Sequence, residues 1–126
     1  MQIAIKVVVA LFAVLFVVLG AGVMLDPSSA PAQFGVESLG LVGSSTLRGD
    51  LGGMFIGAAL MLAWGLLSGR TTLFLAVAVL MGSIAFGRTI GFFVDGANGQ
   101  VIMPFVVELV MVVILVFAHL RLAKTS

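Results

Sequence analysis

The fold of this chain is decided by residues 73–93, LFLAVAVLMGSIAFGRTIGFF, and residues 101–120, VIMPFVVELVMVVILVFAHL. Each stretch has about the 17–25 residues that a helix needs to cross a bilayer. Each also contains one charged residue, Arg88 in the first and Glu108 in the second. A charge in hydrocarbon costs roughly 2.5–3.5 kcal/mol on insertion scales, so such residues tend to pair and to mark a site. Consecutive spans run antiparallel, and we predict that these two residues meet at similar depths.

Two further apolar stretches lie on the N-terminal side, at residues 7–25 and 51–67. The 126 residues are 62% hydrophobic and only 9% charged, whereas a soluble domain has roughly 25% charged residues. Helices are the only spanning structure open to so short a chain, because lipid satisfies no backbone hydrogen bonds. We therefore predict an all-α integral membrane four-helix bundle, a single transmembrane domain over residues 1–126. A long outer loop at residues 26–47 joins the first two helices and partly caps the bundle.

The loop charges are distributed unevenly. The N-terminus, the second loop and the C-terminus carry only basic residues, namely Lys6, Arg70, Arg121 and Lys124. The loops of the opposite side carry one base, Arg48, and the acids Asp26, Glu37, Asp50 and Asp95. Basic loops usually face the cytoplasm. The sequence therefore predicts a multi-pass protein in the lipid bilayer with both termini cytoplasmic.

Five ionisable residues are expected to converge near the outer leaflet. Arg88, Gly91 and Asp95 follow i, i+3, i+7 spacing and share one helix face. Arg48 and Asp50 flank the outer end of the second helix, and Pro104 lies in the first turn of the last helix, where proline costs little. The predicted ligand-binding or polar cluster consists of Arg48, Asp50, Arg88, Asp95 and Glu108.

Small residues recur every four positions on two of the spans. The second span has Gly49, Gly53 and Gly57, and the third has Ser83, Gly87 and Gly91. This spacing lets helix backbones approach closely in lipid, where packing drives association. These faces meet either inside one bundle, which the short connection at residues 68–71 favours, or between protomers of a homo-oligomer.

Several chemistries have no residues to carry them. The chain has no cysteine, no tyrosine and one histidine, so thiolate nucleophiles and thiolate metal ligands are excluded. We interpret His119 as an interfacial residue. No nucleophile–base pair is visible, which argues against an enzyme. We expect no metal site, no resident cofactor and no nucleic-acid partner.

The motifs as a set resemble a known family. They are residues 48–53, Arg-Gly-Asp-Leu-Gly-Gly; Gly87-Arg88-x-x-Gly91; Asp95-Gly96; and a glutamate in the last span. Together they resemble an uncharacterised bacterial family of small four-helix membrane proteins, catalogued as a domain of unknown function. Its architecture is similar to that of the DoxX/DoxD-like group. The resemblance implies a four-helix bundle in the bacterial inner membrane and supplies no activity. DoxX-like proteins are associated with quinone-linked or thiol-redox systems, and a chain without cysteine does not match the thiol-redox branch.

Three classes of function remain open. The first is a structural or accessory protein of a membrane complex, in which buried charges set the helix arrangement. The second is a binder of a small amphipathic or anionic ligand, a lipid headgroup or a quinone, at Arg48 and Arg88. The third is a proton-coupled transporter that uses Glu108, although four helices without internal duplication make a path within one protomer difficult to build.

Overall fold

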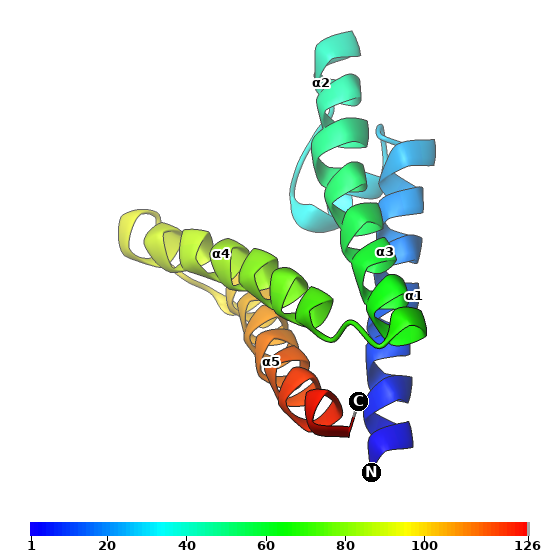
Figure 1. The fold of residues 1–126 in the computed structure, drawn as a ribbon. Coiled ribbons are helices and arrows are strands. Elements are labelled where there is room, and N and C mark those ends of the chain that lie inside the picture. The colour runs from blue at the N-terminus through cyan, green and yellow to red at the C-terminus, as the bar shows by residue number, and fades with distance from the viewer. Residues whose placement is uncertain (126) are drawn as a thin grey trace. The chain divides into compact units, whose positions relative to one another are not determined.

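The computed structural model describes residues 1–125 and is all-helical over that range. Four helices are long and apolar enough to cross a membrane: Gln2–Leu25, Gly40–Ser68, Thr72–Val94 and Gly99–Leu122. The fold class predicted from the sequence is confirmed to that extent. The helices in Figure 1 are α1 (Gln2–Leu25), α2 (Gly40–Thr46), α3 (Gly53–Ser68), α4 (Thr72–Val94) and α5 (Gly99–Leu122).

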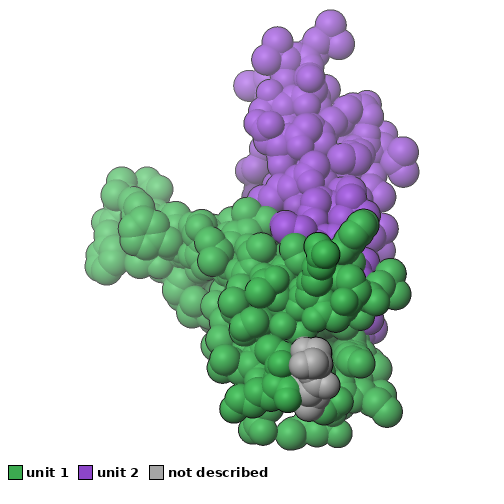
Figure 2. Space-filling view, in the orientation of Figure 1, with its two compact units in different colours: residues 1–9, 64–126 green, residues 10–63 purple. Residues whose placement is uncertain are grey.

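The chain divides into two compact units, which Figure 2 shows in different colours. Unit 2 is Ala10–Ala63, which contains most of α1, the connection to α2, and the first part of α3. Unit 1 consists of Met1–Val9 and the described residues from Trp64 onward, including α4 and α5.

Unit 1 is built around the antiparallel hairpin of α4 and α5 (Figure 1). Its buried residues recur every three or four positions, as one face of a helix requires. On α4 they are Phe74, Val77, Ala78, Met81 and Ala85, and on α5 Glu108, Met111, Leu115, Ala118 and Leu122. Many large apolar side chains on the other faces are exposed. Such a surface is expected for a protein in lipid, because burying an apolar side chain away from lipid contributes little free energy.

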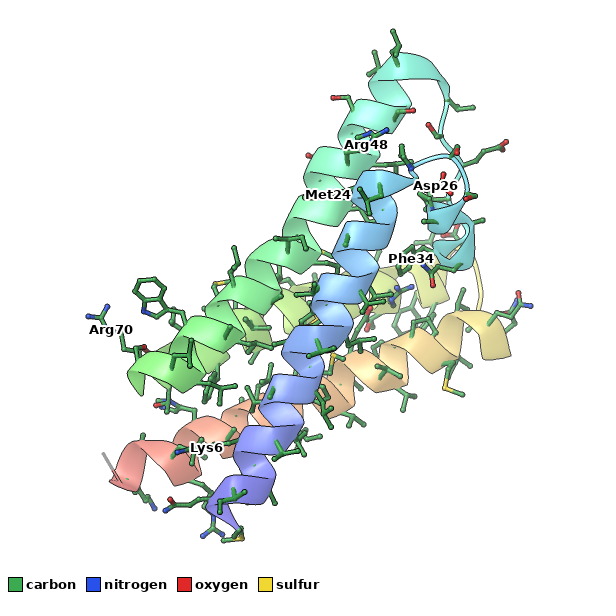
Figure 3. The ribbon with its side chains drawn as sticks, turned by 90° about the vertical axis from the view of Figure 1, so that its right-hand side faces the viewer. Lys6, Met24, Asp26, Phe34, Arg48 and Arg70 are labelled. Carbon is green, nitrogen blue, oxygen red and sulfur yellow. The ribbon has the colours of Figure 1, made fainter. Side chains whose placement is uncertain are left out.

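Unit 2 pairs residues 10–25 of α1 with the first part of α3 and with the π-helical segment Leu47–Gly52 that precedes it, through a close backbone approach. A Cβ on Gly20 would lie 2.9 Å from the carbonyl oxygen of Gly52, and one on Gly52 would lie 2.7 Å from Met24 Cγ. Phe16 stacks on Phe55 with 5.8 Å between ring centroids. Phe34, in the 3₁₀ helix Ala30–Phe34, stacks on the same Phe55 at 5.6 Å (Figure 3).

The connection between the first two spans is shorter than the sequence predicts. We expected a loop over residues 26–47, but helix α2 begins at Gly40 and continues through the π-helical segment Leu47–Gly52 into α3. Gly, Ser, Thr and Val are weak helix formers, which favours a loop at residues 40–47. Extending an existing helix is nevertheless far easier than nucleating a new one. The 29 residues of Gly40–Ser68 make a helix about 43 Å long at about 1.5 Å per residue.

The position of Pro104 also differs from the prediction. Helix α5 begins at Gly99, two residues before the predicted span, with Asn98 as its N-cap. The Asn98 side chain accepts hydrogen bonds from the backbone N–H groups of Gln100, at 2.9 Å, and Val101, at 3.2 Å. Pro104 therefore lies inside the helix, where it cannot donate to the carbonyl of residue 100. Because Asn98 caps α5, the helix begins earlier than predicted, and Pro104 lies in its interior instead of its first turn.

Candidate functional site

Arg88 and Glu108 form an ion pair that joins α4 to α5. Arg88 Nε donates to both carboxylate oxygens of Glu108, at 2.9 Å to Oε1 and 3.1 Å to Oε2. The side chains retain 33% and 11% of their accessible surface, respectively. Arg88 follows Ala85 by three positions and Glu108 precedes Met111 by three, so the pair extends the buried stripes of both helices. The predicted contact between these two spans is present.

Aromatic packing lies one helical turn from the ion pair, toward the turn that joins the helices. Phe92 and Phe105 meet edge to face, with ring centroids 5.0 Å apart and planes at 77°. Phe92 follows Arg88 by four residues, and Phe105 precedes Glu108 by three residues. Such a pair contributes about 0.5–1.5 kcal/mol beyond its buried area. The ion pair and the aromatic pair together set the register of α4 against α5.

Arg88 also faces a shallow pocket of about 170 Å³. Gly91, Asp95 and Gly96 line this pocket from the end of α4, and Val101 lines it from the start of α5. The Nη groups of Arg88 and the carboxylate of Asp95 have no hydrogen-bond partner among residues 1–125. The predicted helix face shared by Arg88, Gly91 and Asp95 therefore lines one side of this pocket.

Arg48 and Asp50 belong to the other unit, within the π-helical segment Leu47–Gly52. An Nη group of Arg48 donates to the backbone carbonyl of Met24, at the end of α1 (Figure 3). This contact supplies a donor to one of the last carbonyls of α1, which have no partner within the helix. Asp50 is exposed and has no partner among the described residues. The convergence of all five ionisable residues stays a prediction, because its members belong to two units.

The π-helical segment was not foreseen. Short π-helical insertions are rare in α-helices, and those that occur are often found at functional sites. This one contains Arg48, Gly49 and Asp50. Two glycines within four residues were the available signal, since glycine tolerates unusual backbone geometry.

The predicted packing glycines do not make close contacts inside their own units. A Cβ on Gly49, Gly53, Gly57 or Gly87 would meet no atom of its unit within 4 Å. Ser83 donates to the carbonyl of Val79 in its own helix, at 2.8 Å, and a Cβ on Gly91 would meet only Asp95 Oδ2 at 3.9 Å. Their role in packing against a second protomer or a partner stays a prediction. The glycines at close approach are Gly20, Gly52 and Gly65.

His119 has a partner that the sequence did not predict. Its Nδ1 lies 3.0 Å from the hydroxyl oxygen of Thr71, and Thr71 retains only 8% of its accessible surface. Thr71 is the N-cap residue of α4 but makes no side-chain cap. The contact links the start of α4 to the last turn of α5, 48 residues away. No local pattern could have found it.

Asp26 is the titratable group with a clearly shifted pKa, and it lies beyond the end of α1. The hydroxyl of Ser28 donates to it at 2.6 Å, and the hydroxyl and backbone N–H of Ser29 donate to it as well. These hydrogen bonds, that of the Ser28 hydroxyl first, lower the pKa of Asp26 from its ordinary value of 3.8 to about 2. Asp26 orders the turn after the first span and was not among the predicted site residues.

The described residues contain no group of three or more His, Asp or Glu side chains able to hold a metal ion. What the fold and site define is a small helical protein with four membrane-spanning candidates and an ion-paired helical hairpin. Residues 4–119 match the family described as domain of unknown function (DUF4345), and the chain belongs to that family. No curated protein and no solved structure matches it.

Proposed function

We propose that this protein is a small multi-pass membrane protein that serves as a structural or accessory component of a membrane complex. The observation that supports this best is that both arginines of the predicted outer cluster, Arg48 and Arg88, already have a hydrogen-bond partner within the protein. Arg88 contacts Glu108 and Arg48 contacts the Met24 carbonyl, so each has a partner inside its own unit. The part-buried ion pair in particular is a polar contact that can select one helix arrangement over competing ones. The ion pair would then hold α4 and α5 in the register that a partner recognises.

The four apolar helices support the membrane placement. We place the basic residues on the cytoplasmic side, with both termini inside, because basic loops are retained there. We further propose a bacterial inner membrane and a DoxX-like architecture. The support for both is the residue pattern at positions 48–53, 87–91 and 95–96, together with membership of the domain family.

A second candidate function rests on the pocket beside Arg88. Arg88 and Asp95 line this pocket, and Arg88 is also paired with Glu108, so the surroundings do not favour an anion. The free Nη donors would instead suit a neutral acceptor such as a quinone oxygen, with the apolar part of the ligand in lipid. The transporter alternative, with Glu108 as proton carrier, gains no support from a carboxylate whose two oxygens both contact Arg88.

The test is purification of the tagged full-length protein from its native membrane in mild detergent. If the protein is an accessory component, it will purify with a second polypeptide in fixed stoichiometry. Glu108→Gln, which weakens the hold on Arg88, should lose that polypeptide. Glu37→Gln is the matched control, because Glu37 is exposed and outside the hairpin, and it should retain the partner.

Two outcomes would contradict the proposal. If the unaltered protein and both variants purify only as a monomer or homo-oligomer, with no second polypeptide, an accessory role in a complex is excluded. Equal retention of the partner by both variants would show that the ion pair does not set the recognised surface. A co-purifying quinone that is lost on Arg88→Gln, detected by mass spectrometry of the extracted lipids, would establish the second candidate instead.

A further inference from the structure

The end of unit 1 opposite the ion pair carries basic residues and no acid. Residues 1–9, 64–73 and 113–125 contain Lys6, Arg70, Arg121 and Lys124 together with His119, and no Asp or Glu. The guanidinium of Arg121 lies 5.1 Å from the ring centroid of Phe117, on its own helix. Lys6 has no hydrogen bond or ion pair among the described residues. This end of unit 1 therefore holds an excess of positive charge that no acidic side chain offsets.

A pocket of about 160 Å³ lies at this end, inside unit 1. Lys6 and Gln2 line it from the first turns of α1, Gly69 and Thr71 from the turn between α3 and α4, and Leu122 from the end of α5. In Figure 3 the Lys6 side chain lies beside the end of α5, whereas Arg70 extends away from it. The volume far exceeds the ~30 Å³ that a single water molecule occupies in the liquid.

The polar part of the lining offers hydrogen-bond donors to an oxyanion. Lys6 supplies an ammonium group and Gln2 a side-chain amide, both able to donate hydrogen bonds. The pocket also meets the N-terminus of α4, because Thr71 is the N-cap residue and Phe74 lies in the first turn. The N–H groups of Leu73 and Phe74 donate to the carbonyls of Arg70 and Thr71, so this end of α4 contributes its positive dipole rather than free donors.

We propose that this pocket binds a phosphate group and that the phosphate belongs to an anionic phospholipid. Phe74, Leu66 and Leu122 add apolar surface beside the polar groups, as the boundary between a headgroup and its acyl chains requires. Basic pockets between helices on the cytoplasmic side are where such headgroups bind in membrane proteins. The inference rests on the proposed membrane placement alone and is independent of a partner protein.

The experiment is native mass spectrometry of the full-length protein in a neutral detergent, titrated with phosphatidylglycerol or phosphatidylcholine of identical acyl chains. One phosphatidylglycerol should bind at least five times more tightly than phosphatidylcholine. Lys6→Gln should weaken phosphatidylglycerol about fivefold, the equivalent of about 1 kcal/mol for one lysine at an anionic surface. Lys6→Arg should restore it, and circular dichroism should show unchanged helix content because Lys6 is exposed.

Arg70→Gln is the matched control, because it removes the same charge from the same end without touching the pocket. It should change the affinity less than twofold. Equal affinities for the two lipids, or equal losses in Lys6→Gln and Arg70→Gln, would overturn the proposal. Displacement of phosphatidylglycerol by an equal concentration of inorganic phosphate would overturn the lipid as the occupant. Release of the protein from native membranes by alkaline carbonate would instead show that the membrane placement is wrong.

Discussion

The α4–α5 hairpin and the pairing of α1 with α3 hold two helices together by different means. In the hairpin, side chains meet at the end near the connecting turn: Arg88 contacts Glu108, and Phe92 contacts Phe105 edge to face. In the α1–α3 pair, the backbones themselves approach at Gly20 and Gly52. The only charged side chain recorded in that pairing, Arg48, donates to a backbone carbonyl. The hairpin is specified by complementary charges, and the α1–α3 pair by a close backbone approach beside the Phe16–Phe55 stack.

The difference reflects what lipid allows. Apolar side chains gain little by leaving lipid for a helix interface, so helices associate through close packing or through polar contacts. Burying a charge pair is costly, and any register of the two helices that leaves one of the charges unpaired costs more still. A glycine contact costs little to bury but tolerates no added atom at the point of approach. The hairpin should therefore be sensitive to the loss of one charge, and the α1–α3 pair to an added Cβ at the point of approach.

The largest effect is expected in the hairpin. Arg88→Leu or Glu108→Leu alone should lower the free energy of unfolding by roughly 2–4 kcal/mol, slightly less than a fully buried pair because a third of the Arg88 side chain is accessible. The double variant should lose less than the sum, because no unpaired charge remains. A double-mutant cycle of unfolding in detergent measures this coupling, expected at about 1–3 kcal/mol.

Strict additivity in that cycle would mean that the ion pair does not couple the two helices. Glu37→Leu serves as the control, because it also removes an acid but at an exposed position. It should change stability by no more than about 0.5 kcal/mol. A loss at Glu37 as large as that at Glu108 would point to a general effect of charge.

A smaller effect is expected in the α1–α3 pair. Gly20→Ala places a Cβ 2.9 Å from the Gly52 carbonyl oxygen and 2.8 Å from Ile56 Cγ1. Because the backbone oxygen cannot move aside, the substitution should destabilise the protein by about 1–3 kcal/mol. Gly57→Ala, also inside a helix, meets nothing within 4 Å in its unit and should be neutral or stabilise by up to about 1 kcal/mol. Thermal unfolding in detergent measures both, and changes of the same sign would refute the close approach.

The smallest effect concerns the turn that follows α1. Because the pKa of Asp26 is lowered to about 2 from 3.8, its hydrogen bonds to Ser28 and Ser29 add stability above about pH 4. That contribution should fade as the pH falls toward 2. An NMR titration should place the Asp26 midpoint near 2, and Ser28→Ala should shift it toward the ordinary value. A midpoint near 3.8 in the unaltered protein would show that the serine hydrogen bonds do not form.

The sequence predicted well those features that depend on a residue's own chemistry and its distance along the chain. The four apolar helices follow from composition. The contact of Arg88 with Glu108 follows from their similar depths: Arg88 lies 15 residues after the start of the span 73–93, and Glu108 lies 12 residues before the end of the antiparallel span 101–120. Prediction was weaker at helix ends. Residues 40–47 were assigned to a loop, and Pro104 to a first turn, because local propensity does not report how far a neighbouring helix propagates.

The sequence by itself determined the helical class and which two charges would pair, because hydrocarbon imposes its length and polarity requirements residue by residue. Only the tertiary structure decided which glycines lie at a backbone approach: Gly20 and Gly52, rather than the evenly spaced Gly49, Gly53 and Gly57. It also decided that Thr71 would meet His119 and that Lys6 would line a pocket with the start of α4. Those contacts depend on how helices rotate about their axes and on residues far apart in sequence, which no local pattern encodes.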